Sequence, residues 1–201
     1  MAVIPLNIVL FNDFETLDAM GPAEVFGWTG EDADYRVGCF SLSGGLVTSK
    51  QGVRFDTRPL AEVDAAGVLL IPGGMGVRTL VDDAGFVARV AELAEQASFV
   101  LTVCTGSALL ARTGLLDGRE ATTNKIAFDW VVSVRPAVQW VRRARWVADG
   151  KFYTSSGVTA GIDMALGFLA DRTSLDFARA RAARIEHIWS EDRENDPFAR
   201  P

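Results

Sequence analysis

Two short apolar runs, each leading directly into a turn of small residues, constrain the fold of this chain more than any other feature. The first covers residues 67–71 and leads into Pro72-Gly73-Gly74-Met75-Gly76; the second covers residues 99–103 and leads into Cys104-Thr105-Gly106-Ser107. Runs that are apolar at every position are typical of parallel strands buried on both faces. Helical patterns follow both turns, so we predict an α/β protein with an open, doubly wound parallel sheet whose ligands bind at the carboxyl ends of the strands.

The remaining segments supply the other elements of such a sheet. Residues 6–11 are predicted to form a central buried strand and residues 35–42 a second strand. A helix is expected to begin at Pro22, because a missing N–H costs nothing at the first helical position. Residues 138–147 and 151–155 are expected to form a peripheral hairpin across Asp149-Gly150. Shorter extended pieces are predicted at 46–49 and 53–57, and helices at 86–96, 125–134, 159–171 and 174–189.

Length and composition limit the classes of protein that fit. The chain has 201 residues, of which 49% are hydrophobic and 23% charged, which indicates a single globular domain over residues 1–190 and a charged tail over 191–201 that needs no structure. No apolar run is long enough for a membrane span and no signal peptide is evident, so we expect a cytoplasmic protein. The net charge of −6 argues against a nucleic-acid partner. The one basic cluster, Arg142, Arg143 and Arg145, is predicted to lie on an exposed hairpin face.

Cys104 is the residue whose position most clearly indicates chemistry. It follows a buried strand and precedes a helix start, so the free N–H groups of that helix are expected to stabilise its thiolate and lower its pKa. The small residues after it allow a tight turn that presents the sulfur, as serine is presented in α/β-hydrolases. The alternative is that Cys104 is a buried small apolar residue. That packing role is the one expected for Cys39, which lies inside a strand, and both thiols are expected to be free.

Four other residues are candidates for a site around this cysteine. Gly73 and Gly74 leave the neighbouring strand at the same edge of the sheet, so their N–H groups are candidates for an anion hole, although a plain tight turn also explains them. Asp18, in the loop after the first strand, is a candidate proton donor or acceptor, and Glu24 is a second one. Either carboxylate could instead serve only to stabilise a helix N-terminus. The single histidine, His187, is predicted to be exposed on the last helix, without a catalytic role.

Taken together and in order, a series of motifs resembles the DJ-1/PfpI superfamily from residue 6 to about residue 172. The motifs are Leu17-Asp18-Ala19-Met20-Gly21-Pro22, Ile71-Pro72-Gly73-Gly74, Val103-Cys104-Thr105-Gly106-Ser107, Gly114-Leu115-Leu116-Asp117-Gly118, Ala121-Thr122-Thr123 and Thr159-Ala160-Gly161-Ile162-Asp163. The isonitrile hydratase branch is the most similar, through its Leu-Asp-x-x-Gly-Pro and Cys-Thr-Gly-Ser patterns. The resemblance implies a flavodoxin-like three-layer sandwich and a homodimer that uses no metal or organic cofactor.

The same resemblance implies a reaction on a small-molecule substrate. In that branch a thiolate adds to the isocyanide carbon, and water resolves the covalent thioimidate to an N-substituted formamide. Cys104 would be the nucleophile and Asp18 the acid or base that positions water. Thr105 would tune the thiolate through its hydroxyl, and the N–H groups of Gly74 and Thr105 would form the anion hole.

Two positions depart from the patterns of the superfamily. Thr105 stands where the protease-like branch carries a histidine, which disfavours peptidase activity. Asn124, within Thr122-Thr123-Asn124-Lys125, stands where many hydratase-like members carry a histidine. Asn124 is therefore a further candidate site residue, and the identity of the substrate stays open.

Two other functions stay open as well. A glyoxalase- or deglycase-like enzyme acting on small aldehydes would need the same thiolate, with Glu24 rather than Asp18 as the essential carboxylate. A redox or electrophile sensor would need only the oxidation of Cys104 to sulfenic or sulfinic acid. The motifs also resemble the sensory domain of AraC-type transcription regulators. Because the chain ends within about thirty residues of the shared region, no DNA-binding domain is expected.

Overall fold

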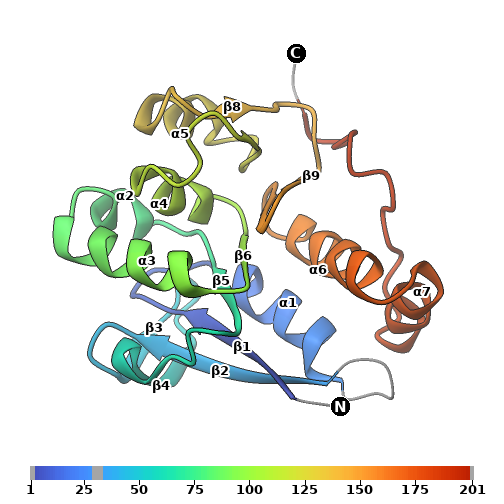
Figure 1. The fold of residues 1–201 in the computed structure, drawn as a ribbon, viewed down its shortest axis with the longest axis horizontal. Helices are drawn as coiled ribbons and strands as arrows, with labels where there is room; N and C mark the ends of the chain where they lie inside the picture. Colours follow the sequence, from blue (N-terminus) through green and yellow to red (C-terminus); the bar gives the residue numbers. More distant parts are fainter. Residues whose placement is uncertain (1–2, 29–33, 200–201) are drawn as a thin grey trace.

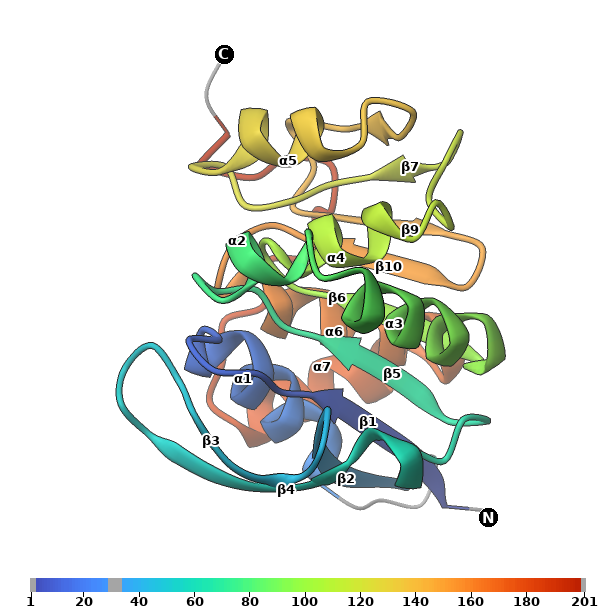
Figure 2. The same cartoon turned by 90° about the vertical axis from the view of Figure 1, so that its left-hand side faces the viewer.

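The computed structural model describes residues 3–28 and 34–199. Its centre is an eight-stranded sheet with the order β3-β4-β2-β1-β5-β6-β10-β9 (Figures 1 and 2). The strands from β4 to β10 in this order pair in parallel, and the two edge strands, β3 and β9, are antiparallel to their neighbours. The strands of this sheet are β1 (Ile4–Val9), β2 (Tyr35–Ser41), β3 (Gly45–Thr48), β4 (Arg54–Pro59), β5 (Val68–Ile71), β6 (Phe99–Thr102), β9 (Trp146–Asp149) and β10 (Phe152–Ser155).

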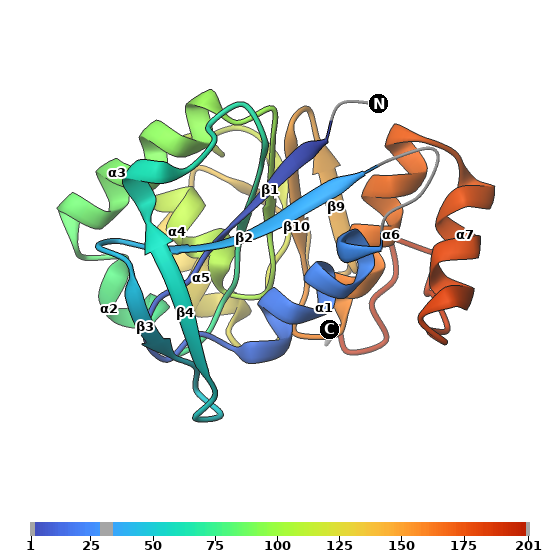
Figure 3. The ribbon, with the colours of Figure 1, turned by 90° about the horizontal axis from the view of Figure 1, so that it is seen from below.

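Helices cover both faces of the sheet, which confirms the predicted flavodoxin-like three-layer α/β sandwich (Figure 3). On one face α1 and α7 both pack against α6. On the other face α2 and α3 pack against α4, and α5 extends that layer. The helices are α1 (Thr16–Gly27), α2 (Val77–Leu80), α3 (Ala84–Gln96), α4 (Gly106–Arg112), α5 (Phe128–Val134), α6 (Ala160–Arg172) and α7 (Leu175–Arg184), with a 3₁₀ turn, η1, at Leu60–Glu62.

The central strands are the ones that the apolar runs predicted. All four residues of β5 are buried, as are Leu6 and Ile8 of β1 and Leu101 of β6, because helices exclude water from both faces of these strands. Since β1, β5, β6 and β10 run parallel, their carboxyl ends meet at one edge of the sheet. The turns that carry the candidate site residues therefore lie together at that edge.

The predicted start of the first helix is wrong. The helix α1 begins at Thr16, so Pro22 lies in its interior and Asp18 lies in its first turn rather than in a loop. An interior proline costs the helix one hydrogen bond and a steric adjustment. The burial of Pro22, Val25 and Phe26 against the rest of the protein outweighs that cost.

The prediction of one alternating strand over residues 138–147 is also wrong. Gln139–Trp140 forms β8, which pairs with β7 (Glu120–Ala121) in a separate two-stranded sheet. The hairpin turn at Asp149-Gly150 is confirmed, but it joins β9 to β10, and β10 lies inside the main sheet rather than at its periphery. The alternation of residues predicted that the side chain of Arg145 would face solvent. It is instead buried in an ion-pair cluster.

The segment after the last helix also differs from its prediction, which was a helix over residues 174–189 and a tail that needs no structure. The last helix ends at Arg184, and the following segment turns back so that His187 Nε2 lies 2.9 Å from Asp163 Oδ1. Residues 190–199 form no helix or strand, yet Asp196 is buried and paired with Arg145. None of the helices within residues 3–28 and 34–199 combines the length and apolar character that a membrane span requires.

Candidate active site

Cys104 lies at the turn between β6 and α4, as predicted. Its backbone is in the left-handed region, with φ at +57°, and its N–H donates to the Ser156 carbonyl at 3.0 Å. A positive φ is uncommon for a residue with a side chain and marks a backbone that its surroundings hold in place. Cys104 is 7% exposed, so the thiol lies below the surface.

Asp18 is the titratable group beside this thiol. It projects from the first turn of α1, is fully buried, and its Oδ2 accepts the N–H of Gly73 at 2.9 Å. Burial raises the pKa of Asp18 to about 7, against the stabilising effect of the Gly73 N–H. The nearby charge of Glu15 raises this pKa further, while the Cys104 thiol and the Val158 N–H oppose the rise. Asp18 therefore changes its charge near neutral pH.

The surroundings of Cys104 oppose its ionisation. Burial raises the pKa of the thiol far above its usual range, and the carboxylate of Asp18 raises it further. The Thr105 N–H and the Asn124 side chain favour the thiolate but do not compensate. The prediction that a helix start lowers this pKa is wrong, because α4 spans only 7 residues and the removal of sulfur from water outweighs its dipole. Near neutral pH the Cys104 thiol is therefore protonated. The Asp18 carboxyl group beside it is partly ionised, because the pH is then close to its pKa.

The glycine turn after β5 brings Asp18 and Thr105 together but leaves no free anion hole. The Gly73 N–H is bound to Asp18, and the Gly74 N–H donates to Thr105 Oγ1 at 3.1 Å. The Thr105 hydroxyl therefore contacts this turn rather than the sulfur, and it is the Thr105 N–H that faces Cys104. Glycine is required at 73 because a Cβ there would lie 2.6 Å from the Thr105 nitrogen and 2.9 Å from Asp18 Oδ2.

Asn124 completes the contacts of the thiol. Its Oδ1 accepts the N–H groups of Ile126 and Ala127, at 2.9 and 3.0 Å, which fixes the carboxamide and leaves its N–H₂ to face Cys104. A Cβ at residue 157 would lie 2.4 Å from Asn124 Nδ2, so glycine at 157 allows this approach. Asn124 thus occupies the site itself, as the sequence suggested.

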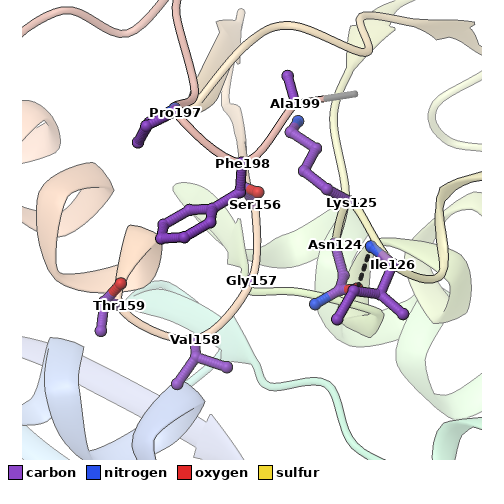
Figure 4. Close-up of a pocket in the computed structure, with 10 residues that line it drawn as sticks. All are labelled: Asn124, Lys125, Ile126, Ser156, Gly157, Val158, Thr159, Pro197, Phe198 and Ala199. Carbon is purple, nitrogen blue, oxygen red and sulfur yellow. Dashed lines mark hydrogen bonds between the residues drawn. The ribbon is translucent and has the colours of Figure 1, made fainter. Parts of the chain in front are cut away.

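A pocket of about 490 Å³ opens beside these groups. Its lining includes Asn124, which contacts the thiol, Val158, whose N–H faces Asp18, and Ser156, whose carbonyl accepts the Cys104 N–H (Figure 4). Phe198 lines the opposite side. Cys104 and Asp18 do not themselves line the pocket, so it adjoins the buried pair through Asn124, Ser156 and Val158.

Sequence reasoning missed two parts of this site. Val158 has φ at +48°, a strained value for a β-branched residue, and this conformation turns its N–H toward Asp18. The signal was a third small-residue turn, Gly157-Val158, after the strand 152–155. The second omission is the tail, residues 190–199, whose Phe198 lines the pocket. The sequence carries no local signal for this, because the position of the tail depends on the ion pair between Asp196 and the distant Arg145.

Other candidates lie outside the site. Glu24 is exposed and accepts the indole N–H of Trp28 at 2.8 Å, and His187 pairs with Asp163. Cys39 lies in β2, half-buried against the core, as predicted. Among the described residues, no three His, Cys, Asp or Glu side chains are grouped so that they could hold a metal ion.

These features define a class of protein: an open α/β sheet that presents a cysteine at the carboxyl end of a central parallel strand. The chain belongs to the DJ-1/PfpI family, whose profile matches residues 6–171. It is 30% identical to the isonitrile hydratase of Pseudomonas putida, in a match that covers 92% of this chain and 78% of that protein. A ThiJ/PfpI family protein from Pseudomonas syringae superposes with a TM-score of 0.83 at 27% identity, covering 92% of this chain and 76% of that one.

The relatives also include regulators. The HTH-type transcriptional regulator GlxA of Rhizobium meliloti is 26% identical, and the match covers 72% of this chain but 45% of the regulator. The family to which this chain belongs therefore contains an enzyme and transcriptional regulators.

Proposed function

We propose that this protein hydrates isonitriles to N-substituted formamides. The observation that carries the proposal is the buried pair of Cys104 and Asp18, in which a protonated thiol lies beside a carboxyl group with a pKa of about 7. Such a pair can move a proton from sulfur to a substrate atom at neutral pH, which is what addition to an isocyanide carbon requires. The similarity to the isonitrile hydratase of Pseudomonas putida supports this choice of substrate class.

In the first half of the reaction the Asp18 carboxylate accepts the thiol proton while Cys104 Sγ bonds to the terminal carbon of R–N≡C. Asp18 then gives this proton to the same carbon, so the product is the thioimidate Cys–S–CH=N–R. The Thr105 N–H and the Asn124 carboxamide stabilise the sulfur as negative charge develops on it, because both already face it.

In the second half water adds across the carbon–nitrogen double bond. Its hydroxyl bonds to carbon, with Asp18 as the base, and a proton is delivered to nitrogen. The carbon–sulfur bond then breaks, the hydroxyl proton returns to sulfur through Asp18, and R–NH–CHO leaves. One water is consumed and the thiol and carboxyl group are restored, so no redox partner is needed.

The structure weakens the two alternatives left open by the sequence. An aldehyde-directed enzyme that depends on Glu24 does not fit, because Glu24 is exposed and bonded to Trp28. A peroxide sensor through Cys104 is disfavoured, because susceptibility to oxidation follows thiolate character and burial raises the pKa of this thiol.

The test is formamide production from a simple aryl isocyanide, with intact-protein mass spectrometry on the same samples. Wild-type protein is expected to turn over, Cys104→Ala to show none, and Asp18→Asn to lose roughly 100-fold or more while its thiol stays reactive. Glu24→Gln is the control and should match wild type. No turnover by wild-type protein would remove the hydratase, and binding of the isocyanide without turnover would favour a ligand-sensing role like that of a regulator.

We further propose that the protein is a homodimer in the cytoplasm. Large apolar side chains are exposed on β3 and in the turn after β5, at Leu46 and Met75, and a second copy would cover them. The free cysteines fit a reducing compartment. Light scattering should give twice the chain mass of 21.7 kDa, and a monomer at micromolar concentration would contradict the dimer.

A further inference from the structure

The C-terminal tail, residues 190–199, is held against the body of the protein by a buried charge cluster. Figure 1 shows it running from α7 past α6 toward β9. The Arg145 guanidinium lies 2.7 Å from Asp163 Oδ2 on α6 and 3.4 Å from Asp196 Oδ1 on the tail. The Arg145 N–H also donates to the Arg193 carbonyl at 2.7 Å. The tail is therefore fixed through both its backbone and a side chain.

Asp196 sets the conformation of the last described residues. Its N–H donates to the Arg143 carbonyl at 2.7 Å, and its Oδ1 accepts the Phe198 N–H at 2.9 Å. Its carbonyl accepts the Ala199 N–H at 3.0 Å. The carboxylate that pairs with Arg145 thus also determines where Phe198 lies.

From this turn the ring of Phe198 projects into the pocket, between Thr159 and Asn124 (Figure 4). Phe198 is 67% exposed, so its ring contributes little to the fold while it presents a large apolar surface to the pocket. Ile126 and Val158 add apolar surface to the same space, and Asn124, Lys125, Ser156 and Thr159 add polar groups. Phe198 is therefore the one aromatic side chain among the lining residues of a mixed pocket.

We propose that Phe198 determines substrate specificity by contacting the apolar substituent of a substrate whose reacting carbon lies at Cys104. The proposal rests on the proposed reaction, and it names the substrate class: a neutral isonitrile that carries an aryl or bulky alkyl group on nitrogen. Two of the three Lys125 Nζ donors are used within the protein, by Thr122 Oγ1 at 2.8 Å and the Ala144 carbonyl at 2.6 Å, and burial lowers the pKa of this ammonium to about 8. The tail thus supplies a wall of the substrate site.

The first test compares kcat/KM for cyclohexyl isocyanide with that for methyl isocyanide. Wild-type protein should prefer the cyclohexyl compound, and Phe198→Ala should lower the ratio of the two values roughly tenfold, the size of effect that one lost apolar contact gives. Ile188→Ala is the matched control, since Ile188 is 95% exposed and outside the pocket lining. An unchanged ratio in Phe198→Ala, or no preference in wild type, would overturn the proposal.

A second test does not depend on turnover. Rates of Cys104 alkylation by iodoacetamide and by N-phenyl-2-iodoacetamide are measured by peptide mass spectrometry, which separates Cys104 from Cys39. Phe198→Ala should slow labelling by the phenyl reagent relative to the plain one roughly fivefold. A shifted labelling ratio without isocyanide turnover would sink the hydratase and keep the Phe198 assignment. Isocyanide turnover with an unchanged kcat/KM ratio and an unchanged labelling ratio in Phe198→Ala would keep the hydratase and remove the Phe198 assignment.

Discussion

Asp18 and Cys104 share one buried site, so the charge on one determines the charge that the other can carry. A charged carboxylate beside the thiol holds the sulfur proton in place, and the same carboxylate is the group that can remove it when an electrophile arrives. The resting protein therefore keeps a weakly reactive thiol, and reactivity depends on a substrate that accepts the proton. In the proposed reaction Cys104 would differ in this respect from a cysteine whose thiolate is stabilised in advance by a cation.

Burial of Asp18 makes the stability of the protein depend on pH in a defined direction. The pKa of Asp18 is about 7 in the folded protein and 3.8 for an ordinary aspartate, so the folded state binds more protons between these values. Wild-type stability should therefore fall as pH rises from about 4 to about 7 and level off above. Asparagine does not ionise, so the stability of Asp18→Asn should not fall in this way. Its free energy of unfolding should exceed that of wild type by on the order of 4 kcal/mol at pH 8, and this difference should be much smaller at pH 4.

Urea denaturation of both proteins across this pH range checks this expectation, because titrating groups that are not coupled to Asp18 contribute equally to both and cancel in the difference. Glu24→Gln serves as the control carboxyl substitution on the same helix, on an exposed side chain. Parallel stability curves for wild type and Asp18→Asn would show that the carboxyl group titrates normally in the folded protein.

At the scale of elements, local patterns predicted what local forces determine. The strands β5 and β6, the turns after them and the position of Cys104 were all predictable, because burial on two faces and a tight turn each require particular residue types next to one another in the sequence. The start of α1 was not predictable, because packing against distant residues overrides the rule for proline. The direction of the pKa shift of Cys104 was not predictable either, since its burial depends on the whole fold.

The turn after β5 gives a sharp test at this scale. Gly73→Ala would place a Cβ against the Thr105 nitrogen and Asp18 Oδ2, so the turn must move away from both. We expect a loss of about 1–3 kcal/mol in stability and a larger fractional loss of turnover, because the Gly73 N–H that binds Asp18 shifts with the turn.

Gly27→Ala, where a Cβ would meet nothing within 4 Å, is the matched control and should change neither property. Thermal unfolding and kcat/KM are measured for both variants. A Gly73→Ala protein with wild-type stability and activity would show that the turn adapts freely and does not position Asp18.

For the whole molecule, the Arg145 cluster joins parts that the sheet does not connect. Asp163 Oδ1, on α6, accepts the N–H of Ser190 at 3.1 Å and lies 2.9 Å from His187 Nε2, while its Oδ2 is bound to Arg145 next to β9. Asp196 brings the end of the tail into the same cluster. One buried cation therefore pairs with two carboxylates from segments far apart in the sequence, and it ties the tail that lines the pocket to the core.

Arg145→Met keeps the length of the side chain but leaves Asp163 and Asp196 buried without the guanidinium. Removing one partner of a buried ion pair typically costs about 3–5 kcal/mol, and we expect a loss of this size in urea denaturation at pH 7. Arg179→Met is the control: Arg179 pairs with Glu191 on the surface, so its loss should stay within about 1 kcal/mol.

If the folded Arg145→Met protein is measured with the two isocyanides, its preference for the cyclohexyl compound should fall as in Phe198→Ala, because the tail has lost its ion pair with Arg145. Equal stability of the two arginine variants would mean that the cluster does not hold the tail, and the position of Phe198 would then need another cause.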